Sequence, residues 1–467
     1  MMTSRLHRSR LLLLSCGLVT VVACGKEGEQ GDDGGADSSG SSSSASTSLT
    51  TTTSATSSNT TDPSCIEGSE DCPCLDGVEC QGTLQCIENE CKPGPTFDPD
   101  QDDRAVLGGL VVPVQVDVNA DEYSWSQVSG PSTEILGDGA NIQVPIPADA
   151  NPGDVISLRI TATRNTIEAT FDYNITVLEP TFEDFLVGVA DPEQLGTSVA
   201  LDFDGAGNLW VASSEGFLSR FDPEGMFQNR YDLAGAPSSM RLGDFYIADQ
   251  DDNIDVLYLA DATAQSISAY NPANDQTNLI VDALEGGGPL GPVSSVLPDG
   301  GGDLFMVNRD SNQIIYYSVD DGVARVLTEA VVGLATLSFG PDANVLYVGT
   351  VGQVWRVGVL QDGTAAEPSL YVDVGDTMDP LQEVGGLAFD EGGNLWIGVP
   401  GARAAHVAHY VVDGATDIAR SFSDVGTTDS SFVGLRYGRG DFDDATLYWT
   451  NRSDRTVGRI QTGLRGG

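Results

Sequence analysis

The chain has 467 residues and a formal net charge of −47, from 22 lysine and arginine residues against 69 aspartate and glutamate residues. This length exceeds one ordinary domain and allows a large hydrophobic core. A surface this acidic repels phosphate backbones and anionic lipid headgroups, so the composition argues against nucleic acid as a partner. Only Lys26 and Lys92 are lysines, so arginine carries nearly all the positive charge of the later domains.

Residues 1–23 have the features of an export signal. Three arginines precede an apolar run over residues 11–23, which is too short to span a membrane but has the length of a signal-peptide core. The run ends Val21-Val22-Ala23-Cys24-Gly25, which resembles the bacterial lipobox. This resemblance implies cleavage before Cys24, a lipid on its thiol and, because glycine follows, anchoring in the outer membrane. The alternative is an ordinary secretory signal with an incidental cysteine.

Residues 24–63 begin with this predicted lipid anchor and continue as a glycine- and aspartate-rich segment, then a serine- and threonine-rich one. Such a composition cannot bury a core, so it predicts a flexible tether. Its reach would be on the order of 35 Å on average.

Six cysteines lie close together in residues 64–95, and no cysteine follows them. They are Cys65, Cys72, Cys74, Cys80, Cys86 and Cys91. In an exported protein this density predicts a small module held by three disulfides, with 15 pairings that the spacing cannot distinguish. A zinc site is the weaker alternative, because the spacing contains no Cys-x-x-Cys pair and no histidine is near.

Residues 104–179 predict an all-β domain. Apolar residues alternate from Leu110 to Val118, and further strands are expected at 122–127, 141–146, 155–163 and 167–177. The stretch Tyr123-Ser124-Trp125-Ser126-Gln127, followed by Ser129-Gly130-Pro131, resembles a strand of PKD-like immunoglobulin-fold domains. That resemblance implies that Trp125 packs in the core of a β-sandwich and that the domain serves as a spacer or adhesive module.

A repeated unit dominates residues 181–467. The stretch Gly207-Asn208-Leu209-Trp210-Val211 has five later counterparts, whose leucines follow at intervals of 48, 47, 42, 49 and 52 residues. This is the period of a β-propeller blade. Each repeat accommodates four short strands separated by glycine- and aspartate-rich turns, so the sequence predicts six blades.

The two ends of the repeated region predict how the ring closes. The last repeat ends after three strands, whereas Phe182 to Val189 is an additional strand before the first repeat. If that segment supplies the outer strand of the last blade, it removes an open edge there and ties the first blade to the last.

The stretch Leu387-Ala388-Phe389-Asp390-Glu391-Gly392-Gly393-Asn394-Leu395-Trp396 resembles the repeat of NHL-type propellers and of the gluconolactonase (SMP-30) and streptogramin-lyase groups. The lactonase group would imply a channel metal held by Glu, Asn and Asp, but the corresponding stretches here are 196–198, 333–336 and 384–386, and none carries that set. A lyase-type histidine is also not matched: His406 and His409 are three apart on one expected strand and point to opposite faces.

One acidic hairpin in the second blade is a candidate calcium site. Asp249, Asp251, Asn253 and Asp255 place an oxygen donor at every second residue, as at the start of a calcium-binding loop. However, Ile254 stands where such loops need glycine, and no glutamate occupies the twelfth position. A solvated acidic hairpin is therefore the alternative.

Two Asn-Arg pairs follow the second strands of blades three and six. Asn308-Arg309 and Asn451-Arg452 would face each other across one rim of the channel, because these blades are opposite in a ring of six. Paired guanidinium groups can hold a carboxylate or sulfate, including that of a uronic acid. The alternative is that each arginine bridges acidic groups of neighbouring blades.

Together these features predict an all-β protein of the cell envelope: a lipid anchor, a disulfide-rich module, an immunoglobulin-like sandwich and a six-bladed propeller. The favoured function is non-catalytic binding of a protein or glycan ligand. The competing function is a calcium-dependent lactonase or hydrolase of the gluconolactonase group. Convergent oxygen ligands in the channel would favour the enzyme, and an apolar or hydroxyl-lined channel would favour binding.

Overall fold

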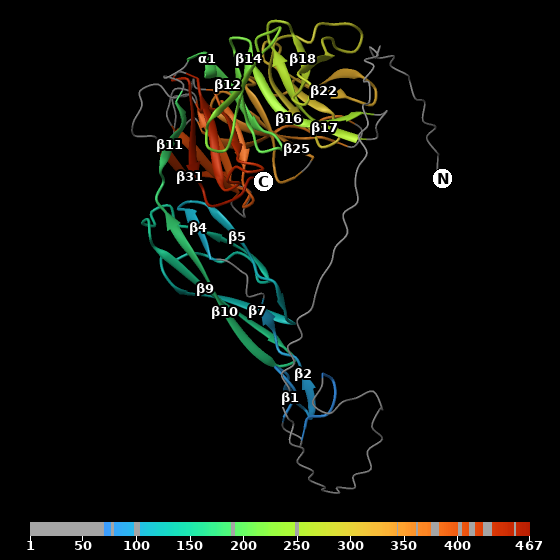
Figure 1. Cartoon of the computed structure of the whole chain (residues 1–467). Helices are drawn as coiled ribbons and strands as arrows, with labels where there is room; N and C mark the ends of the chain where they lie inside the picture. Colours follow the sequence, from blue (N-terminus) through green and yellow to red (C-terminus); the bar gives the residue numbers. More distant parts are fainter. Residues whose placement is uncertain are drawn as a thin grey trace, which may run out of the picture. The chain divides into compact units, whose positions relative to one another are not determined.

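The computed structural model of the chain describes residues 70–75, 79–97, 103–187, 192–247, 252–342, 344–360, 363–374, 383–399, 404–410, 416–423, 432–452 and 454–467. These residues form 34 strands and one four-residue helix, α1 (Pro192–Leu195), so the fold is all-β (Figure 1). No helix in this part of the chain is long and apolar enough to cross a membrane. The predicted signal, the lipid site at Cys24 and the tether lie outside the described residues.

The cysteine-rich module contains two short paired strands, β1 (Gln85–Ile87) and β2 (Glu90–Lys92). Disulfides join Cys74 to Cys86 and Cys80 to Cys91. Cys72 is disulfide-bonded as well, and Cys65 lies outside the described residues. The disulfide prediction is confirmed for these bridges, and the zinc alternative is wrong for them because sulfurs bonded to each other are not thiolate ligands.

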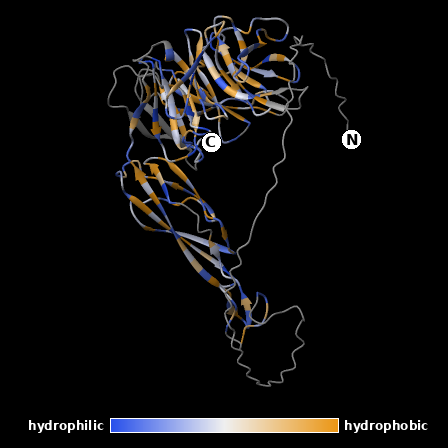
Figure 2. Ribbon diagram, in the orientation of Figure 1, coloured by the Kyte–Doolittle hydropathy of each residue, from blue (hydrophilic) through white to orange (hydrophobic). Residues whose placement is uncertain are grey.

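An immunoglobulin-like β-sandwich follows this module. Its strands are β3 (Thr96–Phe97), β4 (Arg104–Leu107), β5 (Val111–Gln115), β6 (Val118–Asn119), β7 (Glu122–Ser129), β8 (Asn141–Pro145), β9 (Val155–Arg164) and β10 (Ile167–Leu178). One sheet has the order β4-β10-β9-β7, the second pairs β5 with β8, and a short pair joins β3 to β6. Apolar and polar residues alternate along these strands (Figure 2), which places one apolar face of each sheet in a shared core. The expected continuous strand at 110–118 is divided between β5 and β6.

The Tyr-x-Trp-x-Gln stretch on β7 forms a turn-stabilising unit. The Gln127 side chain donates to the Pro131 carbonyl at 2.6 Å and accepts from the Thr133 N–H at 3.1 Å. Gly130, at φ 96°, lies so close to the Val155 carbonyl that a Cβ atom would come within 2.2 Å, which explains glycine there. Trp125 packs against the core while half-buried, and its Nε1 donates to the Gly139 carbonyl at 2.8 Å.

Six four-stranded sheets form the propeller, in which successive first strands contact one another in a closed ring. Blades one to three contain β12 (Ser198–Phe203), β13 (Leu209–Ser213), β14 (Phe217–Phe221), β15 (Phe227–Asp232), β16 (Ser239–Ile247), β17 (Asp252–Asp261), β18 (Ser266–Asn271), β19 (Gln276–Val281), β20 (Val293–Pro298), β21 (Leu304–Asn308), β22 (Gln313–Ser318) and β23 (Val323–Thr328). Blades four to six contain β24 (Thr336–Phe339), β25 (Val345–Gly349), β26 (Gln353–Gly358), β27 (Ser369–Asp373), β28 (Gly386–Phe389), β29 (Leu395–Val399), β30 (Ala404–Tyr410), β31 (Thr416–Ser423), β32 (Phe432–Tyr437), β33 (Thr446–Asn451), β34 (Thr456–Gln461) and, as the outer strand of blade six, β11 (Phe182–Val187).

Blade six is completed by the segment that precedes blade one. Strand β11 pairs antiparallel with β34, from Phe182 opposite Ile460 to Val187 opposite Thr456. The predicted closure is therefore confirmed. Aromatic contacts seal the junction, with the Phe203 ring of blade one 5.1 Å from the Tyr448 ring of blade six.

The repeated Asn-Leu-Trp stretch forms a buried polar turn. In blade one the Asp204 carboxylate accepts from the Asn208 N–H and from Trp210 Nε1, both at 2.8 Å. The same arrangement recurs in blade five with Asp390, Asn394 and Trp396. Both indole rings are fully buried, so the aspartate supplies the acceptor that each indole N–H needs inside the blade.

The sandwich contacts the propeller at the turn of blade five. Asn394 Oδ1 accepts from the Val111 N–H, and Asn394 Nδ2 donates to the Val111 carbonyl, both at 2.9 Å. Gly463, at φ 82°, approaches the Ala105 carbonyl so closely that a Cβ atom would lie within 1.8 Å. Hydrogen bonds and a shared apolar core join the sandwich to the propeller. The prediction of a spacer or adhesive module did not include this contact.

Candidate functional site

The first strand of each blade lines the central channel. In every blade one residue of this strand is paired with the repeated aromatic residue of the second strand. These six residues, named here the channel ring, are Asp202, Arg241, Leu297, Ser338, Ala388 and Arg436 in blades one to six. All six line one cavity, so the repeat determines where they point while their chemistry differs from blade to blade.

Towards the start of the first strands, small side chains widen the channel into a cavity of about 540 Å³, named here the mouth cavity. Ala200, Gly386 and Gly434 leave this space open on three blades. Hydroxyl groups come from Ser214, Ser238, Ser239, Thr263, Ser294, Ser295 and Thr336. The volume lies in the range of small-ligand sites, and the wall offers many hydrogen-bonding groups.

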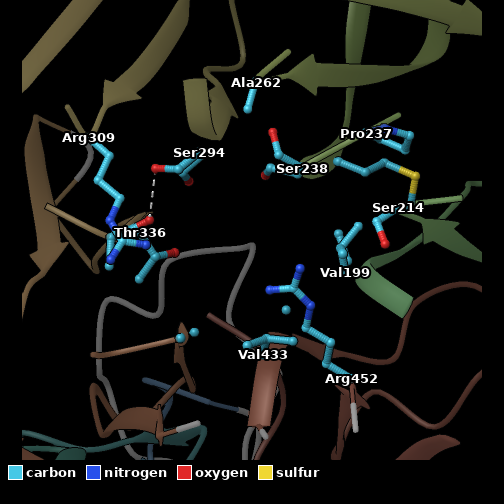
Figure 3. A pocket seen from close by; sticks show the side chains of 18 of the residues that line it. Val199, Ser214, Pro237, Ser238, Ala262, Ser294, Arg309, Thr336, Val433 and Arg452 are labelled. Atoms are coloured by element: carbon cyan, nitrogen blue, oxygen red, sulfur yellow. Dashed lines mark hydrogen bonds between the residues drawn. The ribbon is translucent and has the colours of Figure 1, made fainter. Parts of the chain in front are cut away.

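Arg309 and Arg452 both line the mouth cavity (Figure 3). Arg309 forms an ion pair with Glu383, and both side chains remain partly exposed. Figure 3 shows the Arg452 guanidinium extending from its loop into the hollow, opposite the wall that carries Ser238. The structure thus brings the two arginines to one cavity, where Arg309 is paired with Glu383.

The asparagines of the two Asn-Arg pairs have a different position. Asn308 is 5% exposed, and its Nδ2 donates to the Leu290 carbonyl at 3.0 Å. Asn451 is 4% exposed, and its Nδ2 donates to the Asp454 carboxylate at 2.8 Å. Asn308 thus ties its loop to the segment before β20, whereas Asn451 bonds within its own loop, and both amides position the arginines that follow them.

Arg241 lies at the bottom of the mouth cavity. It is 7% exposed and lines both the mouth cavity and the cavity around the channel ring, so it lies between them. Its Nη2 reaches the Leu337 carbonyl of blade four at 3.4 Å. Its Nε is buried without a hydrogen-bond partner among the described residues, and none of their carboxylates forms an ion pair with it.

Asp202 and Arg436 are the other charged members of the channel ring. Arg436 Nε lies 3.6 Å from Asp202 Oδ2, which also accepts from the Leu242 N–H at 2.9 Å. Burial raises the pKa of Asp202. Burial also lowers the pKa of Arg436 to about 10, against the opposing effect of Asp202, so Arg436 stays cationic at neutral pH. The ring therefore carries two guanidinium groups and a single carboxyl group.

The second cavity, of about 700 Å³, lies at the ring and beyond it. Its lining includes Arg439 and Arg465, so six arginines line the two cavities together. The described acidic side chains in the two linings are Glu383, Asp202 and Asp444. In a chain with a net charge of −47, the scarce positive charge is thus concentrated along the channel.

The acidic hairpin of blade two is a paired β-ribbon. Strands β16 and β17 remain in register as far as Ile247 opposite Asp252, so Asn253 and Asp255 belong to the ladder. The Asp255 carboxylate accepts from the Gly205 N–H of blade one at 3.2 Å. Asp249 and Asp251 lie outside the described residues, and calcium binding there stays a prediction.

Two of the three stretches that correspond to lactonase metal positions, 333–336 and 384–386, contribute to the lining of the mouth cavity. Thr336, Val384 and Gly385 line it, and Glu383 is the acidic side chain among its described lining residues. His406 and His409 lie on β30, with side chains outside the described set. Among the described residues, the one grouping of three metal-ligating side chains is Cys74, Cys80 and Cys91, which belong to disulfides.

Sequence reasoning missed the channel ring and the hydroxyl-lined wall. A signal for the ring was present, because its members can be found by pairing each repeated aromatic residue with the first strand of its blade. Aligned in this way, Asp202, Arg241 and Arg436 are the charged exceptions among six equivalent positions. The wall hydroxyls had no such signal, since serine is common in loops.

No protein-family model matches the sequence, and no curated protein is significantly similar to it. Among solved structures, a protein assigned as a gluconolactonase is 15% identical with a TM-score of 0.48, covering 62% of this chain and 93% of its own. An auxiliary nutrient-binding protein from Bacteroides thetaiotaomicron is 12% identical with a TM-score of 0.46, covering 78% and 98%. The calcium-binding protein regucalcin from Agrobacterium tumefaciens is 15% identical with a TM-score of 0.46, covering 61% and 96%. The six sheets of the chain themselves define it as a β-propeller protein.

Proposed function

We propose that the protein is a lipid-anchored protein of the cell envelope whose propeller binds an acidic glycan in the mouth cavity without transforming it. This proposal rests on the lining of the cavity, which combines seven hydroxyl side chains with three arginines and one glutamate. Hydroxyl groups hydrogen-bond sugar hydroxyls, and guanidinium groups bind carboxylates. Ser238 and Ser294 donate to backbone carbonyls and therefore act towards a ligand as acceptors. Of the two expected ligand classes, protein and glycan, this chemistry favours the glycan.

The competing function, a calcium-dependent lactonase or hydrolase, has less support. A catalytic calcium ion needs six to eight oxygen ligands with several carboxylates. The channel ring instead carries Arg241 and Arg436, and two cationic side chains repel a divalent cation. The carboxylate of Glu383 is also engaged by Arg309.

The proposed anchor is Cys24, which holds the propeller at the outer membrane through the tether. The sandwich, whose Gln127 turn agrees with the resemblance to PKD-like domains, supports the propeller through Asn394. A Cys24→Ser variant should move from the membrane fraction to the soluble fraction after cell lysis. Retention of that variant in membranes would contradict the anchor and leave glycan binding untouched.

Glycan binding can be measured with the full chain purified from membranes in detergent. Uronic-acid oligosaccharides should bind, and neutral oligosaccharides of the same length should not. The Arg325→Ala variant provides a control, because Arg325 is an exposed arginine paired with Glu285 rather than a lining residue of either cavity. Binding of no glycan would contradict the proposal, and calcium-dependent consumption of the ligand would favour the hydrolase.

A further inference from the structure

We propose that Arg241 is a buried anchor for a single carboxylate of the ligand, at the bottom of the mouth cavity. This assignment rests on the proposed function and makes it more specific: the ligand is an acidic sugar whose carboxylate enters the channel first. Arg309 and Arg452 then contact the part of the glycan that remains at the rim.

Arg241 is a buried cation without a carboxylate partner among the described residues. A guanidinium group keeps its proton at any physiological pH, so it cannot relieve burial by becoming neutral. Burying a charge without a partner is costly, and buried charges in proteins are normally paired. Arg241 is 7% exposed, and no described carboxylate forms an ion pair with it. A bound anion would supply the missing partner.

Arg241 has one buried hydrogen-bond donor, Nε, without a partner among the described residues. Nη2 of Arg241 is used by the Leu337 carbonyl, whereas the buried Nε has no partner among the described residues. Nη2 carries two N–H groups, so the Nε edge can bind a planar carboxylate through parallel hydrogen bonds from Nε and from the second N–H of Nη2. Because Arg241 also lines the mouth cavity, a carboxylate approaching from the mouth meets this residue at the end of its path.

The carboxyl group of the channel ring, that of Asp202, does not neutralise Arg241. Asp202 accepts from the Leu242 and Phe203 N–H groups and faces Arg436 at 3.6 Å. Arg436 in turn reaches the Leu387 carbonyl at 3.5 Å. The single acidic group of the ring is thus shared, and the ring keeps an excess of positive charge that favours an anion in the channel.

A monosaccharide probe tests this anchor separately from oligosaccharide binding. D-glucuronate should raise the Tm of the full chain in a saturable way at constant ionic strength, because a ligand that binds the folded state stabilises it. D-glucose and the methyl ester of glucuronate, which lack the charge, should not. A sulfated sugar that stabilises the protein more than glucuronate does would overturn the choice of carboxylate.

Two substitutions supply the test at the residue level. Arg241→Met removes the charge at similar volume and should weaken glucuronate binding by roughly 30-fold or more. Arg241→Lys keeps the charge without the planar donor edge and should lose roughly 10-fold. The Met variant should fold, since apolar replacement of buried charges is often neutral or stabilising. The Arg325→Ala control should bind like the wild type.

The outcomes separate the anchor from the wider function. Unchanged glucuronate binding by Arg241→Met, or equal stabilisation by glucose, would overturn the anchor. If uronic-acid oligosaccharides bind but Arg241→Met binds them equally well, the anchor fails while the glycan function stands. If glucuronate binding depends on Arg241 but only an acidic peptide binds with high affinity, the anchor stands and the glycan function fails.

Discussion

The turns of the blades and the channel ring show opposite uses of one repeat. At the turns, blades one and five carry the same three residue types, and both aspartates accept from a buried indole. At the channel ring, equivalent positions carry Asp202, Arg241 and Ala388 in blades one, two and five. Identity between copies therefore marks the groups that hold a blade together, and difference between copies marks the groups that line the channel.

The two turns also differ in one respect that involves the sandwich. Asn208 bonds within its own turn, whereas Asn394 additionally bonds to both backbone groups of Val111. The Asn394 side chain thus stabilises its own turn and also binds the sandwich domain. Four predictions, from the largest expected effect to the smallest, test this division between scaffold and site.

Asp390→Ala should lower the free energy of unfolding by about 3 kcal/mol, because the buried Trp396 indole N–H and the Asn394 backbone N–H lose the carboxylate that accepts from them. Urea denaturation followed by tryptophan fluorescence measures this loss. Asp204→Ala should act in the same direction in blade one. Arg241→Met, in the channel ring, should leave the urea midpoint nearly unchanged, and a larger loss there than at Asp390 would reverse the comparison.

Asn394→Ala should destabilise the protein by about 2 kcal/mol and expose the Val111 amide, since both hydrogen bonds to Val111 are lost. Hydrogen exchange at the Val111 amide provides the readout, with faster exchange expected in the variant. The matched change Asn208→Ala should leave exchange at Val111 as it is in the wild type. Equal exchange in all three proteins would show that Asn394 does not join the domains in solution.

Arg452→Ala should weaken binding of digalacturonate about 10-fold, or about 1.4 kcal/mol. Arg309→Ala should also weaken this binding, about 3-fold, because a ligand competes with the Glu383 carboxylate for the Arg309 guanidinium group. Calorimetric titration of each variant measures these affinities. An unchanged affinity of the Arg452→Ala variant would contradict the assignment of Arg452 as a rim contact.

The pH dependence of stability should report on Asp390, because burial raises its pKa from 3.8 to about 7. The folded state then binds this proton more tightly than the unfolded chain does. The contribution of this bound proton to the free energy of unfolding is therefore full below pH 3.8 and is lost as the pH rises through 7. Between pH 6 and 8 the wild type should lose about 1 kcal/mol relative to Asp390→Asn, measured by urea denaturation. An identical pH profile for both proteins would contradict the shift.

Much of the fold could be predicted from the sequence, because it repeats. The spacing of Leu209 and its counterparts indicated six blades, and β11 was expected from its position before the first repeat. The division of the strand at 110–118 could not be foreseen, since alternation continues through the break between β5 and β6. The contact of Asn394 with Val111 could not be predicted either, because Asn208 lies in the same Gly-Asn-Leu-Trp stretch and bonds within its own turn.

The candidate site was only partly predictable. Arg309 and Arg452 were found as a matched pair, and the structure places both at the mouth cavity. Arg241 was missed because a single arginine in an apolar strand has no local motif, and its importance comes from burial and from contacts across the channel. Long-range geometry of this kind depends on ring closure, which a repeat pattern indicates only in outline.

A crystal structure of the full chain with digalacturonate should show one sugar in the mouth cavity, with its carboxylate at Arg241 Nε and the second sugar near Arg452. Binding at the outer edge of a blade, at the sandwich or on the acidic hairpin of blade two would contradict the proposed glycan site.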